Sequence, residues 1–267
     1  MQKIIFHHRL RSASHINLRR KLGMITRTID YQYDGISHKG YLAYENEIEG
    51  LRPAVLVAHA WRGQDDFARG KAEALAKLGY IGFAADLYGN GKSVKSDDEA
   101  AALMKPLFIN RKLLRGRIAA AYKTVLQQAN VDKERIGAIG FCFGGLTVLE
   151  LSRSGEHLKG VVSFHGLLGD RLGEIKADSI APASKRSGAF LILHGYKDPL
   201  VSLDDIVNMQ KELSQAKLDW QMHIYGDAVH AFTNPVAQEA ESGMLYNAKA
   251  EHRSWQSMKN FFEEVFA

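Results

Sequence analysis

Sulfur, proline and long apolar runs are all scarce in this sequence. Its 267 residues include one cysteine, Cys142, and five prolines. One thiol cannot form a disulfide within the chain or build a cysteine metal cage, and a lone cysteine is typical of proteins from a reducing compartment. No apolar run approaches the roughly 18 residues of a membrane-spanning helix, so no membrane segment is expected. The few prolines and the absence of repeats leave no visible interdomain linker.

Acidic residues are absent from residues 1–24, which contain six of the 35 Lys and Arg residues. The other 29 nearly balance the 30 acidic residues, so the net charge of +5 does not indicate nucleic-acid binding. The segment is rich in Arg and contains Ser, as organelle transit peptides do. We expect an N-terminal extension without a structural role and one cytoplasmic domain over residues 25–267. Organelle targeting by residues 1–24 stays open as an alternative.

Apolar runs of strand length alternate with segments of helical period from Met24 onward. Buried strands are predicted at 54–60, 80–89, 135–141, 158–166, 188–195 and 219–226, and helices at 64–78, 111–129, 146–154, 204–216 and the C-terminus. Such alternation predicts an α/β fold with a mostly parallel central sheet and helices on both faces. Two earlier strands, 27–33 and 38–45, are joined by Asp34 and Gly35, a pair typical of hairpin turns. They predict an antiparallel N-terminal edge.

Glycines surround the single cysteine in the stretch "IGFCFGGLT", residues 139–147. A dinucleotide fingerprint would need glycine at position 142, and a P-loop at "GKS" would need glycine in place of Asp86, so both nucleotide motifs fail. The motif glycine–any residue–nucleophile–any residue–glycine does fit residues 140–144. These residues lie between a predicted strand and a predicted helix. Glycine there removes side chains that would collide with the neighbouring strand and helix. A helix N-terminus also favours a thiolate.

A thiol nucleophile needs a base, and the base needs an acid that orients it. The chain offers Asp198 after one predicted strand and then His230 after the last one, in the order acid before histidine. Both would lie in loops at the carboxyl ends of strands, where open α/β sheets place their sites. Taken singly, the three residues could be a buried structural cysteine, a turn aspartate and a surface histidine. Their shared order and loop positions favour a catalytic triad.

Four stretches, "GFCFGG", "GYKDPLVS", "GDAVHAF" and "ADLYGNG", together resemble the dienelactone hydrolase family. The resemblance covers the chain from about residue 26 onward and implies an α/β-hydrolase fold. It implies that Cys142 is the nucleophile, His230 the base and Asp198 its orienting acid. The implied oxyanion hole consists of the backbone N–H groups of Trp61 and Phe143. The implied activity is hydrolysis of small esters or lactones, as by a carboxymethylenebutenolidase, without cofactor or metal, by a monomer or small homo-oligomer.

Two positions depart from the best-studied pattern of that family. Ala60 stands where this pattern has a glutamate, and Asn234 stands where it has an arginine for the substrate carboxylate. Both departures argue against an acidic dienelactone as the substrate. Besides Asn234, the side chains expected to line the substrate pocket are Arg62, Tyr88, Arg111 and His165.

Three histidines, His59, His165 and His194, each end a predicted buried strand. They lack a paired spacing such as H-E-x-x-H and therefore do not predict a metal site. Polar residues lining a cleft are the simpler interpretation. The sequence leaves three other functions open: a thioesterase or acyltransferase with the same residues, a ligand-binding relative without turnover, and a thiol redox sensor.

Overall fold

The computed structural model describes residues 23–46, 49–177 and 187–267. The predicted extension over residues 1–24 therefore lies outside the described residues, apart from its last two. Met24 already belongs to the first strand. Among the described residues, no helix combines the length and the apolarity needed to cross a bilayer.

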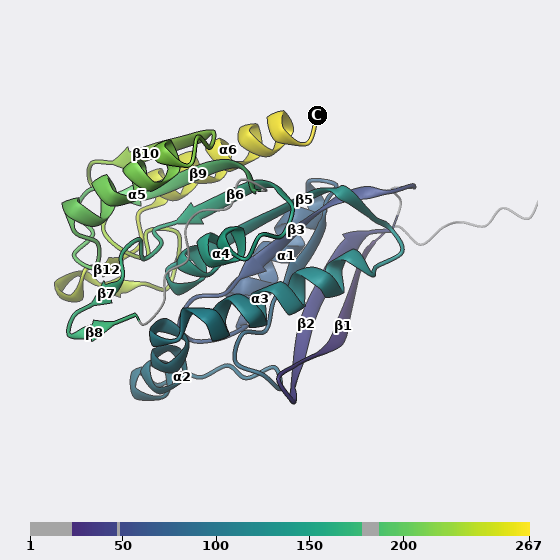
Figure 1. The fold of residues 1–267 in the computed structure, drawn as a ribbon, viewed down its shortest axis with the longest axis horizontal. Coiled ribbons are helices and arrows are strands. Elements are labelled where there is room, and N and C mark those ends of the chain that lie inside the picture. The colour runs from purple at the N-terminus through teal and green to yellow at the C-terminus, as the bar shows by residue number, and fades with distance from the viewer. Residues whose placement is uncertain (1–22, 47–48, 178–186) are drawn as a thin grey trace, which may run out of the picture.

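An eight-stranded sheet, parallel except at its N-terminal edge, forms the centre of the molecule (Figure 1). In spatial order its strands are β1 (Met24–Tyr33), β2 (Ile36–Glu45), β4 (Ile81–Ala84), β3 (Arg52–Ala58), β5 (Val131–Phe141), β6 (Leu158–Phe164), β9 (Ser187–Gly195) and β10 (Trp220–Tyr225). The pairs β1–β2 and β2–β4 are antiparallel, whereas the pairs from β4 to β10 are parallel. The predicted α/β architecture is confirmed, antiparallel edge included.

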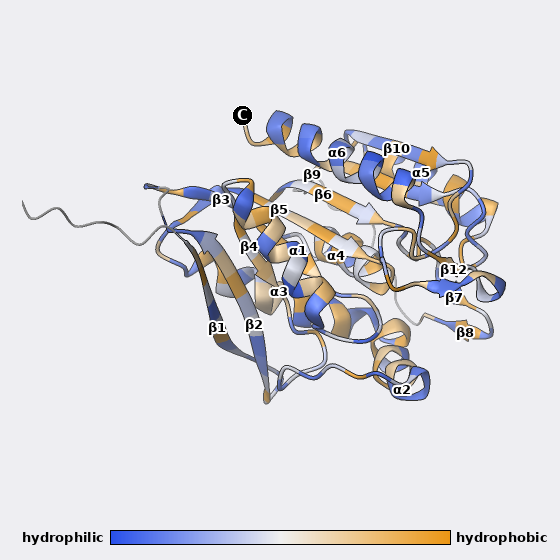
Figure 2. Ribbon diagram, turned by 180° about the vertical axis from the view of Figure 1, so that it is seen from behind, coloured by the Kyte–Doolittle hydropathy of each residue, from blue (hydrophilic) through white to orange (hydrophobic). Residues whose placement is uncertain are grey.

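Helices cover both faces of the sheet and enclose one apolar layer on each side. On one face lie α1 (Asp66–Lys77) and α6 (Ala248–Val265), and on the other lie α2 (Asp97–Ile109), α3 (Arg111–Leu126), α4 (Phe143–Arg153) and α5 (Leu203–Gln215). Figure 2 shows the apolar residues gathered on the central strands, with polar residues on the outer sides of the helices. This is the arrangement expected when both faces of a parallel sheet are buried.

Several boundaries differ from those predicted. Helix α3 ends at Leu126 rather than Ala129, and β5 begins at Val131 rather than Arg135. Helix α2 was not among the predicted helices. Two pairs of two-residue strands and a short 3₁₀ helix were not predicted either, because elements of this length carry no periodic signal. They are β7 (Arg171–Leu172) with β8 (Ile175–Lys176), β11 (Gln238–Glu239) with β12 (Met244–Leu245), and η1 (Ala240–Ser242).

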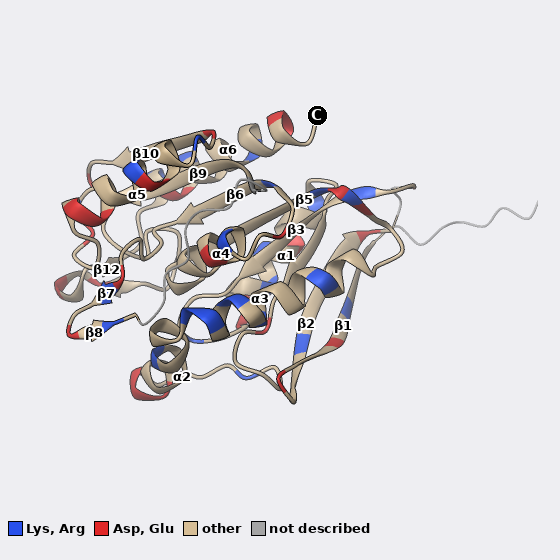
Figure 3. Ribbon diagram, in the orientation of Figure 1, with Lys and Arg blue, Asp and Glu red and all other residues tan. Residues whose placement is uncertain are grey.

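A buried carboxylate joins α3 to α4. Every charged residue of α3 is basic (Figure 3), and two of these residues turn inward to Glu150 on α4. Arg115 Nη1 lies 2.6 Å from a Glu150 oxygen and Arg111 Nη1 lies 3.9 Å away, while Arg153 approaches the same carboxylate to 2.9 Å. A carboxylate without exposed surface needs such partners, because burying it unpaired would cost several kcal/mol, of the order of 3–5. Two of the five basic residues of α3 therefore serve its packing against α4.

Candidate active site

Cys142 occupies a sharp turn between β5 and α4. Its backbone has φ 56° and ψ −118°, a left-handed conformation that is uncommon outside glycine. Its N–H donates to the Phe164 carbonyl at 3.1 Å and to His165 Nδ1 at 3.2 Å. Surrounding contacts are needed to hold such a strained residue, and the two acceptors on β6 and the loop after it supply them.

The glycines around Cys142 make close approaches that no other residue would allow. A Cβ atom on Gly140 would lie 1.9 Å from the Gly144 carbonyl oxygen, and one on Gly144 would lie 2.0 Å from the Ala58 carbonyl oxygen. These are backbone atoms and have little freedom to move aside. The steric reason predicted for the glycines thus applies, and it lets the start of α4 rest directly on the end of β3.

Asp198 and His230 meet in loops that follow β9 and β10. His230 Nδ1–H donates to Asp198 Oδ2 at 2.7 Å, and both side chains are buried. The other carboxylate oxygen accepts the Leu200 N–H at 2.9 Å, and the Lys197 N–H donates to the Ala228 carbonyl, which ties the two loops together. Because Nδ1 donates to Asp198, the Nε2 of a neutral His230 is left as the acceptor.

His230 Nε2 points toward the Cys142 sulfur, but the two atoms do not reach the geometry of a full hydrogen bond. Among the described residues, Nε2 has no other hydrogen-bond partner. Such pairs are often loose before a substrate binds. Burial alone would lower the pKa of His230, but the charge of Cys142 and the Asp198 carboxylate raise it to about 10. The geometry therefore favours an imidazolium at His230 whenever the thiol is ionised.

Removing either negative neighbour is expected to lower the pKa of His230. In Cys142→Ala and Asp198→Asn the imidazolium loses a charge that stabilises it, so its titration midpoint should fall below the wild-type value. Histidine imidazole NMR across a pH series measures this midpoint. An unchanged midpoint in both variants, or an equal displacement of every histidine signal, would contradict the arrangement.

His165 connects the cysteine turn to the histidine loop. Its Nδ1 accepts the Cys142 N–H, so the proton resides on Nε2, which donates to Thr233 Oγ1 at 2.8 Å. Burial, together with nearby His230, holds the pKa of His165 well below its usual range, and the ring stays neutral. Thr233 is not among the residues predicted from the sequence. Its only local signal is its place three residues after His230.

Two adjoining cavities open over these residues. The inner one, of about 60 Å³, has Cys142, His165, His230, Trp61, Arg62 and Asn234 in its wall. The outer one, of about 740 Å³, shares Trp61, Arg62 and Asn234 and adds Asp66, Val236 and Glu239. Met244 of β12 contributes to both. A small chamber holding the thiol and a wider entrance suit a reaction at one end of a small molecule.

The remaining predicted residues lie at different distances from this site. Arg62 lies in both cavities and pairs with Asp97 at 2.5 Å. Tyr88 lines neither; its hydroxyl donates to the Trp61 carbonyl at 2.6 Å. Arg111 is fully buried against Glu150 and Phe108 and is not part of either cavity wall. No three His, Cys, Asp or Glu side chains gather as a metal site among the described residues.

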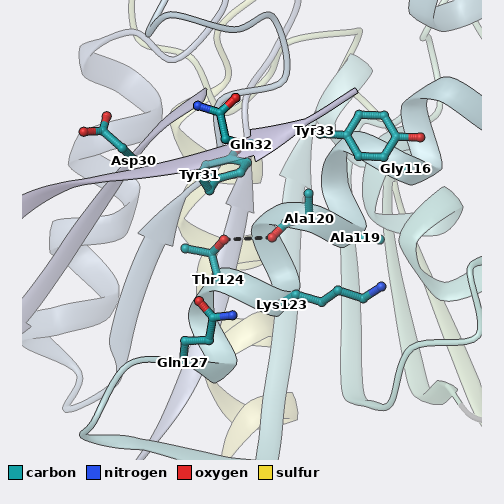
Figure 4. A pocket seen from close by; sticks show the side chains of 10 residues that line it. All are labelled: Asp30, Tyr31, Gln32, Tyr33, Gly116, Ala119, Ala120, Lys123, Thr124 and Gln127. Atoms are coloured by element: carbon teal, nitrogen blue, oxygen red, sulfur yellow. Dashed lines mark hydrogen bonds between the residues drawn. The ribbon is translucent and has the colours of Figure 1, made fainter. Parts of the chain in front are cut away.

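A third hollow lies between β1 and α3 and shares no wall residue with the cavity at Cys142 (Figure 4). Its volume is about 450 Å³, and its wall includes Tyr31, Tyr33, Lys123 and Gln127. The hydroxyl of Thr124 in its wall donates to the Ala120 carbonyl of its own helix. None of the ten residues drawn is a cysteine or a histidine, so this hollow lacks the thiol and the imidazoles that line the inner cavity.

Comparison with known proteins agrees with this geometry. The sequence profile of the dienelactone hydrolase family matches residues 39–266. A solved structure named m3DLH is 38% identical, with a TM-score of 0.82, and the match covers 91% of this chain and 99% of that one. A dienelactone hydrolase-like promiscuous phosphotriesterase from metagenomic libraries is 34% identical, with a TM-score of 0.83, and covers 91% and 98%. A protein from Aquifex aeolicus whose name assigns it, provisionally, to the carboxymethylenebutenolidases is 27% identical over 88% of this chain and 96% of its own length.

Proposed function

This chain belongs to the dienelactone hydrolase family, and we propose that it hydrolyses small esters or lactones that carry no negative charge, through a thioester on Cys142. The observation that supports this most strongly is the 2.7 Å bond from His230 to Asp198, with the other ring nitrogen directed to the thiol in the same cavity. A nucleophile that faces a base, with the base hydrogen-bonded to an orienting acid, is the arrangement that acyl transfer requires.

The reaction follows from the positions of these groups. His230 Nε2 takes the thiol proton, and the thiolate attacks the carbonyl carbon. The N–H groups of Trp61 and Phe143 receive the resulting oxyanion, each contributing about 3 kcal/mol to the transition state. When the carbon–oxygen bond breaks, the leaving alkoxide takes the proton from His230. Water then gives a proton to His230 and attacks the thioester, which releases the acid and restores the Cys142–His230 pair.

The test is to trap the acyl enzyme. With p-nitrophenyl acetate we expect a burst of nitrophenolate equal to the concentration of active chains, and mass spectrometry of a quenched sample should locate one acetyl group on Cys142. A thiol redox sensor or a binding relative without turnover would give neither the burst nor the adduct. A substrate screen with acyl thioesters distinguishes a thioesterase, because the acyl enzyme is common to both activities.

The charge of the outer cavity supports the choice of an uncharged substrate. Three carboxylates, Asp65, Asp66 and Glu239, lie in its wall, against one cation, Arg62, which already pairs with Asp97. Asn234 provides no charge at the position where the family pattern has arginine. A carboxylate on the substrate would therefore face like charges in this wall, whose single cation already has a partner. Apolar contacts come from Phe67 and the exposed Val236.

Glu239→Gln is expected to raise kcat/KM for an anionic ester, such as p-nitrophenyl hydrogen succinate, by about threefold to tenfold, because exposed charges interact by roughly 1 kcal/mol. The value for neutral p-nitrophenyl butyrate should change little. Glu264→Gln, which removes one exposed charge from α6 outside the cavity, is the matched control and should affect neither ester. Equal acceleration by both variants, or a wild-type preference for the succinate, would contradict an uncharged substrate.

We also propose that the domain acts in the cytoplasm as a monomer or small homo-oligomer, from the lone reduced thiol and the family resemblance. Light scattering of the purified chain measures the oligomeric state. Fractionation of cells that express the full sequence, with residues 1–24 present or deleted, tests the organelle-targeting alternative.

A further inference from the structure

The loop that supplies Trp61 is held by two side chains that touch no substrate, and we propose that His59 and Tyr88 are positioning residues that keep the Trp61 N–H directed into the oxyanion hole. This inference rests on the proposed function. His59 follows β3, is fully buried and lines neither cavity. Its role is therefore to be sought in the backbone that it contacts.

The proton on the His59 ring has one consistent position. The Leu87 N–H donates to His59 Nε2 at 3.2 Å, so Nε2 carries no proton. The proton of the neutral ring then resides on Nδ1, which lies 2.6 Å from the Ala60 carbonyl oxygen and donates to it. Burial lowers the pKa of His59 and keeps the ring neutral. Donation to Ala60 is thus the only arrangement that satisfies both nitrogens.

That hydrogen bond sets the direction of an N–H group. The Ala60 carbonyl and the Trp61 N–H belong to one planar peptide, and the described chain contains no cis peptide. In a trans peptide the two groups point in opposite directions, so holding the carbonyl against His59 turns the N–H the other way. The Gly63 N–H donates to the same carbonyl at 3.3 Å, and Tyr88 Oη donates to the next one, that of Trp61. Rotating the Ala60–Trp61 peptide would break the bonds from His59 and Gly63 and present an oxygen to the oxyanion.

The segment "ADLYGNG" after β4 is connected to both supports, because it contains Tyr88 and because its Leu87 N–H donates to His59. Asp86 fixes this segment, because its Oδ1 accepts the N–H groups of Tyr88 and Gly89 at 3.1 and 2.8 Å, and its Oδ2 accepts that of Gly91 at 2.7 Å. The rings of His59 and Tyr88 then meet edge to face, with centroids 4.8 Å apart. Burial, and beyond it Cys142, raises the pKa of Tyr88, so its hydroxyl stays a donor. The segment "ADLYGNG" thus stabilises the loop that contains Ala60 and Trp61.

The test compares His59→Leu, which removes the donor, with His59→Asn, whose amide can still donate to Ala60. Loss of one oxyanion donor costs about 10²–10³ in kcat, so His59→Leu should lose activity on this scale with KM nearly unchanged, and His59→Asn should recover part of it. Tyr88→Phe, which removes a single hydroxyl, should lose less and serves as the second variant if His59→Leu does not fold.

Two further measurements separate this role from a general loss of structure. A trifluoromethyl ketone forms an oxyanion adduct on the thiol and should bind His59→Leu more weakly, in proportion to the loss in kcat. Alkylation of Cys142 by iodoacetamide needs no oxyanion hole and should stay within about twofold of wild type. A crystal structure of His59→Leu should show the Ala60–Trp61 peptide rotated or in two orientations. An unrotated peptide, or alkylation slowed as much as kcat, would overturn the inference. A wild-type chain without a burst would instead refute the proposed function, since peptide orientation is measured without turnover.

Discussion

Replacing Cys142 with alanine should lower kcat/KM for p-nitrophenyl esters by about 10⁴-fold or more, the scale on which removing a nucleophile acts when its partners work as a unit. No described side chain other than Cys142 places a thiol in either cavity, and the sequence contains no second cysteine. His230 and Asp198 would remain bonded to each other but would have no proton to accept from a nucleophile. Steady-state kinetics with a sensitive nitrophenyl ester measures the loss.

The fold of this variant should persist, which makes the loss of activity specific. Alanine retains the Cα and Cβ atoms, the strained φ of 56° and the N–H bonds to Phe164 and His165. Circular dichroism and the thermal unfolding midpoint should therefore match wild type closely. If a properly folded Cys142→Ala kept more than a tenth of the activity, hydrolysis would proceed at another site and the thioester would be excluded.

Gly144→Ala should destabilise the protein by about 3 kcal/mol or more, at or above the upper end of ordinary overpacking. Its Cβ would lie 2.0 Å from the Ala58 carbonyl oxygen, and Ala58 is fixed within β3 between two neighbouring strands. Relief requires moving the start of α4 away from the sheet, and Cys142 would move with it. Urea unfolding followed by tryptophan fluorescence gives the free energy of unfolding.

Gly70→Ala is the matched control for that substitution. Gly70 lies within α1 with open space where a Cβ would stand, so alanine should stabilise the protein by up to about 1 kcal/mol through its higher helix propensity. If the two substitutions change the free energy of unfolding in opposite directions, the loss at Gly144 is due to close packing and not to a general effect of the added methyl group. A Gly144→Ala variant as stable as wild type would contradict the tight contact between α4 and β3.

The sequence predicts the fold well because the sheet is buried on both faces. Strands such as β3 and β6 then read as continuous apolar runs, and the helices between them read as periodic segments. The positions of Cys142, Asp198 and His230 follow from the same logic, since the carboxyl ends of parallel strands share one edge of the sheet. The comparisons confirm the family and the fold, whereas the catalytic roles of these residues remain predictions.

Contacts between elements that lie far apart in the sequence were beyond sequence reasoning. Arg111 was expected to line the substrate pocket as a basic group, yet its side chain turns inward to Glu150. Local spacing shows where α3 begins but does not show which of its charged residues faces α4. The hydrogen bond from the Leu87 N–H to His59 depends on β3 and β4 being neighbours. Neither segment alone indicates that the two strands are adjacent.

Because the chain has a single thiol, in the wall of the inner cavity, labelling of that thiol can count the active molecules in a preparation. Cys142 is 7% exposed, so a small electrophile can reach it, whereas a bulky maleimide would be obstructed by the wall of the inner cavity. With one cysteine per chain, each equivalent of a small labelling reagent consumed corresponds to one reactive centre. Labelling stoichiometry therefore reports the fraction of competent molecules in a preparation, without reference to any substrate.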